Sequence, residues 1–351
     1  YQGLAPAGKD AKFERLDNGL KSDYRYPNNN ASLFLENVFS VNKKLKITPG
    51  ARFEYINTQA DGEIRNVVTD GIGDTILDQT IPDALRNERT VLLGGIGFSY
   101  AYSKDLKFYA NASTNYRPVN FTDLKIVNPS FAVDPNLEDE RGYNIDFGIK
   151  LDREDDLAMD LSFFYLGYRN RIGEIHKVQE GTGQLIRYRT NVSQSRNTGI
   201  ESYIEKVVYQ GTHSRLSAFQ NTAYINAIYL GDDESILDGN QVELVPKWNI
   251  KTGASYYYKK WAFSGQFGYV SQQFSDASNA VETPSAIFGE IPAYSILDFT
   301  VQFKSKNWTV STNIDNALNA AYFTRRATAY PGPGIIPSAP RQVYLTLSYT
   351  F

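Results

Sequence analysis

The 351-residue sequence contains no cysteine, one methionine and only two histidines. Without cysteine the chain can form neither a disulfide framework nor a thiolate metal site. The two histidines, His176 and His213, are too few and too far apart for a histidine metal site or a Ser-His relay. No residue pattern supports catalysis. We therefore expect that the chain is not an enzyme and needs no cofactor or bound metal of its own.

The sequence also lacks an excess of positive charge and long apolar runs. The 36 Lys and Arg residues face 39 Asp and Glu residues, which leaves a net charge of −3 and no electrostatic reason to expect a nucleic-acid partner. No stretch approaches the roughly 18 uncharged apolar residues of a transmembrane helix. Residue 1 is Tyr, with neither a start Met nor a signal peptide in view. We expect the chain to be part of a longer protein whose targeting information lies upstream.

Aromatic residues and glycine are abundant, with 25 Tyr, 20 Phe and 26 Gly. This composition favours strands and turns over helices. The last eleven residues, RQVYLTLSYTF, alternate between apolar and polar side chains, and the same alternation recurs along the chain at 45–55, 96–102, 143–151, 157–165, 261–269 and 296–303. A period of two residues predicts strands with one apolar and one polar face. The sequence therefore predicts an all-β fold.

The links between these runs alternate in length. Short polar links read SVNKK, YSKD, DREDD, YQGTHS, YYKK and KSKN, whereas long links rich in Gly, Pro, Asn and Asp span 58–90, 118–140, 170–195, 230–245, 273–291 and 317–341. Counting the runs gives about thirteen antiparallel strands in an up-and-down meander, with short turns on one side and long loops on the other. Short periplasmic turns and long extracellular loops are typical of transmembrane β-barrels.

A soluble β-sandwich is the alternative to a membrane barrel. Sandwich strands average roughly 5–6 residues, whereas many runs here reach ten and carry aromatics near their ends, such as Trp261, Trp308 and Tyr349. Charged residues recur on the polar face, so that face must be wet and the apolar face must meet something other than water. We therefore favour the antiparallel transmembrane β-barrel.

The strand count indicates a fragment of a larger barrel. Thirteen is odd, whereas bacterial single-chain barrels have even strand counts. The ratio of roughly 27 residues per strand suits the large barrels of about 22 strands that enclose a plug. We expect residues 31–351 to be the C-terminal part of such a barrel and residues 1–30 an extracellular loop or lead-in segment. The plug domain is not in this chain.

Several segments resemble those of TonB-dependent outer-membrane transporters, in the same order and at similar intervals. These segments are 36–55, 109–124, 134–150, 197–202 and 245–258. Segments 269–280, 291–299 and 313–351 resemble in particular the ferric-dicitrate-receptor-like branch. The resemblance covers nearly all of residues 31–351. Where the family has Asn-Leu-Phe-Asp followed by Tyr, this chain has Asn313, Ile314, Asp315, Asn316 and Tyr322, a loose match.

This resemblance implies a receptor in the outer membrane of a Gram-negative bacterium, with a 22-stranded barrel around an N-terminal plug. It also implies uptake of a scarce ferric chelate, driven by the TonB–ExbB–ExbD complex. The implied partners are therefore that complex, the plug domain, the ferric chelate, and the outer-membrane lipid and lipopolysaccharide. Neither a plug nor a TonB box is visible in this sequence. The terminal Phe351, with alternating apolar residues before it, resembles the family's signal for barrel assembly.

A set of polar residues near the predicted extracellular mouth is our candidate ligand funnel. Strand parity places Arg117 on the inner face near the mouth and Gln272 in the same position on its own strand. Arginine matches carboxylates in bidentate fashion, and ferric citrate is an anion rich in carboxylates. The full set is Arg117, Gln272, Arg325, Arg326, Arg187 and Arg189. The alternative is that these arginines pair with loop carboxylates or with lipopolysaccharide phosphates.

A second set lies deeper in the predicted lumen, on the polar faces of the strands: Arg52, Glu54, Asp146, Asp160, Asp298 and Asp315. We predict that these residues face the absent plug. The alternative is a simple solvated wall. The acidic stretch GDDESILDG misses the spacing of a calcium-binding EF-hand loop, which favours a solvated loop there.

The sequence is also compatible with other functions. The substrate could instead be another siderophore, cobalamin or a glycan. A structural or adhesive barrel, with long loops that bind other proteins, is an alternative of a different class. An outer-membrane enzyme is disfavoured by the scarcity of histidine.

Overall fold

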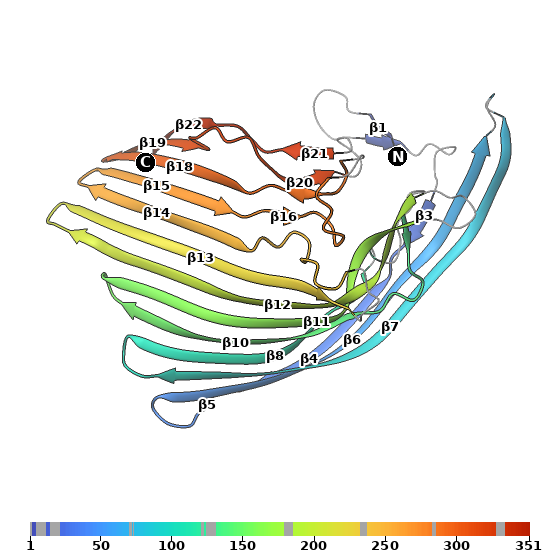
Figure 1. The fold of residues 1–351 in the computed structure, drawn as a ribbon, viewed down its shortest axis with the longest axis horizontal. Helices are drawn as coiled ribbons and strands as arrows, with labels where there is room; N and C mark the ends of the chain where they lie inside the picture. Colours follow the sequence, from blue (N-terminus) through green and yellow to red (C-terminus); the bar gives the residue numbers. More distant parts are fainter. Residues whose placement is uncertain are drawn as a thin grey trace.

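The computed structural model describes residues 2–4, 12–14, 22–69, 72, 74–120, 123, 131–178, 185–231, 237–282, 286–327 and 334–351. Its main feature is one large curved antiparallel sheet, in which thirteen strands lie side by side (Figure 1). The prediction of an all-β fold with about thirteen antiparallel strands is confirmed. Among the described residues, no helix is long and apolar enough to cross a membrane.

The thirteen strands follow one another across the sheet almost in chain order. They are β3 (Ser22–Arg25), β6 (Leu45–Thr69), β7 (Thr75–Ala101), β8 (Leu106–Arg117), β10 (Glu140–Arg153), β11 (Leu157–Val178), β12 (Leu185–Gln210), β13 (Ser214–Leu230), β14 (Trp248–Tyr258), β15 (Trp261–Val270), β18 (Tyr294–Ser305), β19 (Trp308–Asp315) and β22 (Gln342–Tyr349). Strands β4 (Asn28–Glu36) and β5 (Phe39–Ser40) also pair with β6, and β9 (Phe131–Val133) pairs with β12 in parallel.

Three small two-stranded sheets stand apart from the main sheet. They join β1 (Gln2–Leu4) to β2 (Lys12–Glu14), β16 (Gln273–Phe274) to β17 (Glu290–Ile291), and β20 (Phe323–Ala327) to β21 (Gly334–Pro337). In the described part of the chain, the two ends of the main sheet, at β22 and at β3, do not pair with each other. Closure into 22 strands, a plug elsewhere in the protein and the boundary at residue 30 stay predictions.

All six short links are turns between neighbouring strands, at 41–44, 102–105, 154–156, 211–213, 259–260 and 306–307. They lie at one end of the sheet, on the left in Figure 1. The two-residue turns place Lys259 and Lys306 at φ values of 52° and 49°. Positive φ at such positions is what lets a tight turn follow the twist of its two strands. We call this end of the sheet the short-turn end and the opposite end the long-loop end.

Two of the predicted long loops are wrong. Strands β6 and β7 stay paired through 58–69 and 75–90 in a hairpin that projects from the sheet at the long-loop end, and β11 and β12 continue through most of the described part of 170–195. Beyond the membrane both faces of a hairpin meet water, so the apolar–polar alternation fades. The backbone pairing does not depend on that alternation and continues. The sequence pattern therefore ended before the strands did.

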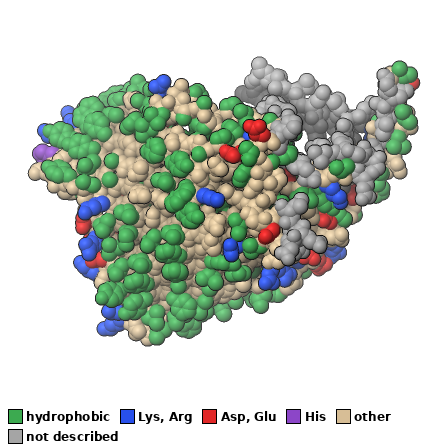
Figure 2. All heavy atoms as spheres, viewed as in Figure 1, with side chains coloured by type: hydrophobic (Ala, Val, Ile, Leu, Met, Phe, Trp, Pro, Cys, Tyr) green, Lys and Arg blue, Asp and Glu red, His purple; other side chains and the backbone are tan. Residues whose placement is uncertain are grey.

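The main sheet has one apolar and one polar face, as the alternation predicted. On β10, Ile145 and Phe147 are 48% and 55% exposed, whereas Asp146 between them lies on the opposite face. Figure 2 shows hydrophobic side chains gathered over the strands, with most of the charged ones toward the strand ends. Soluble monomers rarely expose apolar patches of this extent. The apolar face is therefore built to meet lipid.

Aromatic pairs mark two belts on this sheet. Near the short turns, Trp261 packs against Phe303 and Trp308 against Tyr349, each with ring centroids 4.7 Å apart. Toward the long loops, Trp248 packs against Tyr224 at 4.7 Å. Trp248 and Tyr256 share one face of β14, and their separation of eight positions spans about 27 Å along the strand. At the usual tilt this gives a height of about 20 Å, close to the apolar band of a membrane barrel.

Candidate functional site

Two of the predicted ligand arginines meet at one buried carboxylate near the long-loop end. Arg117 ends β8 and Arg189 lies in β12. The Nη2 atom of Arg117 lies 3.0 Å from both carboxylate oxygens of Asp123, and the Nη1 atom of Arg189 lies 3.0 Å from Oδ1. The Asp123 side chain is only 1% exposed. This carboxylate therefore joins a loop to two strands.

Further carboxylates complete the charge balance around these arginines. Arg117 Nη1 lies 3.3 Å from Glu140 Oε1, and Arg189 Nη2 lies 2.6 Å from Glu174 Oε1. Glu140 also accepts the backbone N–H of Ile172, at 2.9 Å. We call Arg117, Asp123, Glu140, Glu174 and Arg189 the Asp123 cluster. Its three carboxylates outnumber its two arginines, so the cluster offers no surplus positive charge to an anion.

Strand register explains why these charges meet. Arg117 lies directly opposite Glu140 where β8 pairs with β10, and Arg189 lies opposite Glu174 where β12 pairs with β11. Opposite charges at directly paired positions stabilise a sheet. Both arginines thus pair with a loop carboxylate, Asp123, which is the alternative that we named to a ligand, and each also pairs with a strand carboxylate. Their role in ligand binding stays a prediction.

Arg325 and Arg326, both in β20, have different surroundings. Arg326 donates to the backbone carbonyls of Ala286 and Glu290, at 2.9 and 2.7 Å, and its guanidinium lies 5.3 Å from the ring centroid of Phe323. Arg326 therefore ties two loops together. Arg325 is exposed and forms no hydrogen bond or ion pair within the described part of the chain. Of these two, Arg325 is the one whose charge is available to a ligand.

Gln272 and Arg187 are less informative. Strand β15 ends at Val270, so the parity argument does not extend to Gln272, which is exposed, while its neighbour Gln273 is buried. Arg187 lies in β12 opposite His176, and its side chain is outside the described residues.

A cavity of about 430 Å³ borders the Asp123 cluster. Arg117, Glu140 and Arg171 contribute charged groups to its lining, and Asn115 and Tyr168 contribute polar ones. Three buried atoms of this lining, Asn115 Oδ1, the Tyr116 hydroxyl oxygen and Arg171 Nε, have no hydrogen-bond partner among the described residues. Buried polar groups normally have partners, so this cavity suits a small polar molecule. We call it the rim cavity.

Sequence reasoning missed the residues that position Arg171. Tyr229 is fully buried and donates its hydroxyl to Glu243. The Arg171 guanidinium lies 5.9 Å from the Tyr229 ring centroid, with Nη2 3.8 Å from Glu243 Oε1. Arg171 falls in a link that was predicted to be a loop, so no strand parity could be assigned to it. No local signal would have connected it to residues 58 and 72 positions away.

Most residues of the predicted plug-facing set are held by their own neighbours. Asp146 accepts hydrogen bonds from Asn111 and Asn144, at 2.8 and 3.3 Å. Asp160 accepts the Tyr109 hydroxyl at 2.9 Å, Asp298 accepts the backbone N–H of Asn316 at 2.8 Å, and Arg52 pairs with Glu54. Asp315 is exposed at the end of β19. Contact of this set with a plug stays a prediction.

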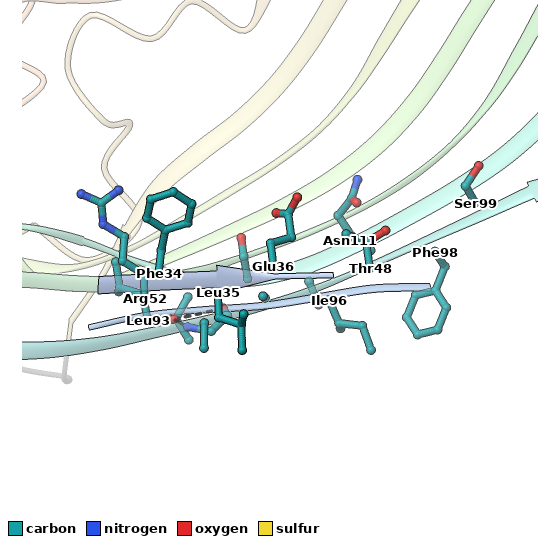
Figure 3. A pocket seen from close by; sticks show the side chains of 18 of the residues that line it. Phe34, Leu35, Glu36, Thr48, Arg52, Leu93, Ile96, Phe98, Ser99 and Asn111 are labelled. Atoms are coloured by element: carbon teal, nitrogen blue, oxygen red, sulfur yellow. Dashed lines mark hydrogen bonds between the residues drawn. The ribbon is translucent and has the colours of Figure 1, made fainter. Parts of the chain in front are cut away.

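The polar face is hollowed where glycines from two strands meet. Gly50, Gly95 and Gly97 line a depression of about 760 Å³ whose polar rim includes Arg52 and Asn111. Figure 3 shows Arg52, Glu36 and Asn111 on one side of the sheet and Leu35, Ile96 and Phe98 on the other. A Cβ on Gly97 would lie 3.0 Å from Asn111 Oδ1, so the close approach of this side chain depends on glycine.

Across the described residues, no three His, Cys, Asp or Glu side chains are grouped as a metal site. The acidic stretch GDDESILDG lies largely outside those residues.

The sequence matches a known protein family and a curated relative. The family described as TonB dependent receptor-like, beta-barrel matches residues 4–317. The metal-pseudopaline receptor CntO of Pseudomonas aeruginosa is 26% identical over 263 residues, covering 73% of this chain and 33% of the relative. The chain thus spans about a third of the length of this curated relative.

Solved structures agree on the fold. The ferric yersiniabactin uptake receptor FyuA of Yersinia pestis superposes with a TM-score of 0.71 at 15% identity, over 94% of this chain and 47% of that one. The ferric citrate transporter FecA gives a TM-score of 0.66 at 16% identity, over 94% of this chain and 55% of that one. Members of the matching family are transporters and not enzymes, as the sequence predicted. The chain belongs to the TonB-dependent receptor-like β-barrel family and forms part of an outer-membrane barrel of a Gram-negative bacterium.

Proposed function

We propose that this chain is the C-terminal barrel portion of a receptor that imports a metal chelate across the outer membrane. The energy would come from the TonB–ExbB–ExbD complex, acting through parts of the protein outside this chain. The observation that carries the proposal is the family match over residues 4–317, together with the matching strand architecture. The relatives named above are receptors or transporters for metal-pseudopaline, ferric yersiniabactin and ferric citrate.

A ferric citrate complex is the first substrate to test. The last third of the sequence resembles the ferric-dicitrate-receptor-like branch. Arg325 is exposed in one of the long-loop-end links and has no carboxylate partner among the described residues, whereas Arg117 and Arg171 of the rim cavity already face carboxylates of the chain. Guanidinium groups bind carboxylates through charge-assisted hydrogen bonds. The metal-pseudopaline receptor makes another metal–metallophore complex the second substrate to test.

The test is calorimetric titration of the purified full-length receptor with ferric dicitrate, cyanocobalamin and a maltodextrin. We expect saturable binding of ferric dicitrate at micromolar affinity or tighter, about −8 kcal/mol or more favourable. The Arg325→Ala variant should bind at least tenfold more weakly, because it removes an exposed guanidinium that has no carboxylate partner among the described residues. The matched control is Arg215→Ala, since Arg215 pairs with Asp155 at the short-turn end.

The outcomes separate the alternatives. Binding of cobalamin or the glycan alone would replace the metal chelate as substrate. If none of the three binds and another metallophore complex does, the ferric citrate assignment fails and metal-chelate import stands. If no chelate binds while the folded barrel attaches to other proteins through its loops, the adhesive-barrel alternative is favoured instead.

A further inference from the structure

Three arginines lie on the apolar face of the sheet near the long-loop end. Arg141 shares its face of β10 with Tyr143, Ile145 and Phe147, whose side chains are 42% to 55% exposed. By the same parity, Arg169 shares its face of β11 with Tyr165 and Phe163, and Arg196 shares its face of β12 with Ile200. These arginines therefore point to the same side as the residues that meet lipid, away from the polar face.

The sheet register brings the three arginines together. Arg141 lies directly opposite Arg169, and Gly167, two residues before Arg169, lies opposite both Tyr143 and Arg196. Directly paired residues have Cβ atoms about 5 Å apart, and diagonal neighbours about 7–8 Å. Like charges at directly opposite positions destabilise a sheet. The Arg141–Arg169 pair is thus unfavourable unless an anion lies between the two guanidinium groups.

No described carboxylate forms an ion pair with Arg141, Arg169 or Arg196. Neither the Arg141 nor the Arg169 side chain forms a hydrogen bond or an ion pair with any described residue, and the buried Nε atom of Arg196 has no partner among them. Arg141 and Arg169 line a cavity of about 690 Å³ together with Asp139 and Glu138. Asp139 is already paired with Arg89 at 2.8 Å. Glu138, the other carboxylate of the described lining, forms no ion pair with a described residue. It accepts a hydrogen bond from the Asn170 side chain at 2.6 Å.

The height of the three arginines in the membrane follows from the aromatic residues beside them. Tyr143 and Tyr165 stack with ring centroids 5.6 Å apart, and their hydroxyls are 3.4 Å apart. Tyrosine on a lipid-facing strand marks the boundary between hydrocarbon and headgroups. Arg141 lies two residues beyond Tyr143 toward the long loops, and Arg169 lies directly opposite Arg141, so both are at the level of the outer-leaflet headgroups.

We propose that Arg141, Arg169 and Arg196 form a binding site for the phosphate groups of an outer-leaflet glycolipid. Guanidinium groups match phosphate oxygens in bidentate fashion. The acyl chains of the same lipid would lie against Phe147 and Phe163 below, which stack with centroids 5.0 Å apart. A bound phosphate removes the repulsion between the paired arginines. The site lies on the face opposite the rim cavity, so it does not depend on which chelate the receptor imports.

The test is lipid binding by the full-length receptor in detergent, measured by native mass spectrometry. The probes are bisphosphorylated lipid A, its dephosphorylated counterpart and inorganic phosphate. We expect the wild-type protein to bind bisphosphorylated lipid A at least tenfold more tightly than the dephosphorylated lipid. The triple variant Arg141→Gln, Arg169→Gln, Arg196→Gln should lose this preference.

The matched control is the double variant Arg153→Gln, Lys206→Gln. Both positions share the apolar face but lie at the short-turn end, toward the other leaflet. This control should keep the wild-type preference. A preference that survives in the triple variant, or that the control also loses, would overturn the proposal. Displacement of the lipid by millimolar inorganic phosphate would show a site for free anions and would also overturn it. Folding of each variant is checked by heat-modifiable migration on gels.

Discussion

Asp123 offers the sharpest test of the packing at the long-loop end. The substitution Asp123→Asn keeps the size of the side chain and removes its charge. The carboxylate is 1% exposed and accepts contacts from Arg117 and Arg189, each at 3.0 Å, and from the backbone N–H of Asn120 at 3.0 Å. The asparagine can keep the backbone bond through its Oδ1, so the loss falls on the two arginine contacts.

The size of that loss follows from burial. Hydrogen bonds to charged groups contribute about 1.5–3 kcal/mol each. Arg117 is 41% exposed, so its contact is screened, and both arginines keep a second carboxylate, Glu140 or Glu174. We therefore expect a local destabilisation of about 2–3 kcal/mol, below the 3–5 kcal/mol for breaking a fully buried pair. This corresponds to roughly 30- to 150-fold faster opening of the joined segments.

Hydrogen exchange followed by mass spectrometry measures this opening directly. In the full-length protein, amides of residues 117–120 and 188–190 should exchange faster by that factor, whereas the β14–β15 hairpin should be unchanged. The control is Asp155→Asn, because Asp155 is 81% exposed in its contact with Arg215 and should contribute almost nothing. Equal protection in the wild type and the Asp123 variant would refute the reasoning, as would an equal effect of the control.

Three further predictions concern other parts of the structure. The Thr190 hydroxyl lies 2.6 Å from the Asp134 carboxylate and lowers the pKa of that carboxyl. The contact should therefore stabilise the fold fully above the ordinary carboxyl pKa of about 4. This stabilisation should be lost as the pH falls through the lowered pKa of Asp134. Exchange of residues 131–136 between pH 7 and 3 should show this loss, and Asp134→Asn should abolish it. Gly148→Ala places a Cβ 2.6 Å from the backbone carbonyl of Leu161 and 2.5 Å from the Tyr109 ring. It should lower the free energy of unfolding by about 1–3 kcal/mol and reduce the yield of folded barrel. The control Gly94→Ala meets no atom within 4 Å and should leave the yield unchanged. Arg326→Ala removes two bonds to backbone carbonyls and should speed proteolysis at 286–290, while Arg325→Ala should leave that cleavage unchanged.

The alternation of apolar and polar residues was enough to predict the strands inside the membrane and the face on which each side chain lies. In that region one face meets lipid and the other meets water, so a shift of one residue would reverse every side chain, and the pattern must be strict. The same parity placed Arg117 on the polar face. It also placed Asp146 and Asp160 there, where their hydrogen bonds to Asn111 and Tyr109 are found.

The sequence did not reveal where strands continue beyond the membrane or which distant residues meet there. Between residues 61 and 84 the described side chains of the β6–β7 hairpin are exposed or half-buried on both faces, so its pairing left no hydrophobic period to read. Arg189 and Asp123 are 66 residues apart, and Arg141 and Arg169 become neighbours only through the register of β10 and β11. Local patterning determined the strands and their faces because lipid and water act on each residue separately. The charge clusters at the long-loop end were decided by the tertiary structure, because a side-chain contact depends on the relative register of strands that the local pattern does not encode.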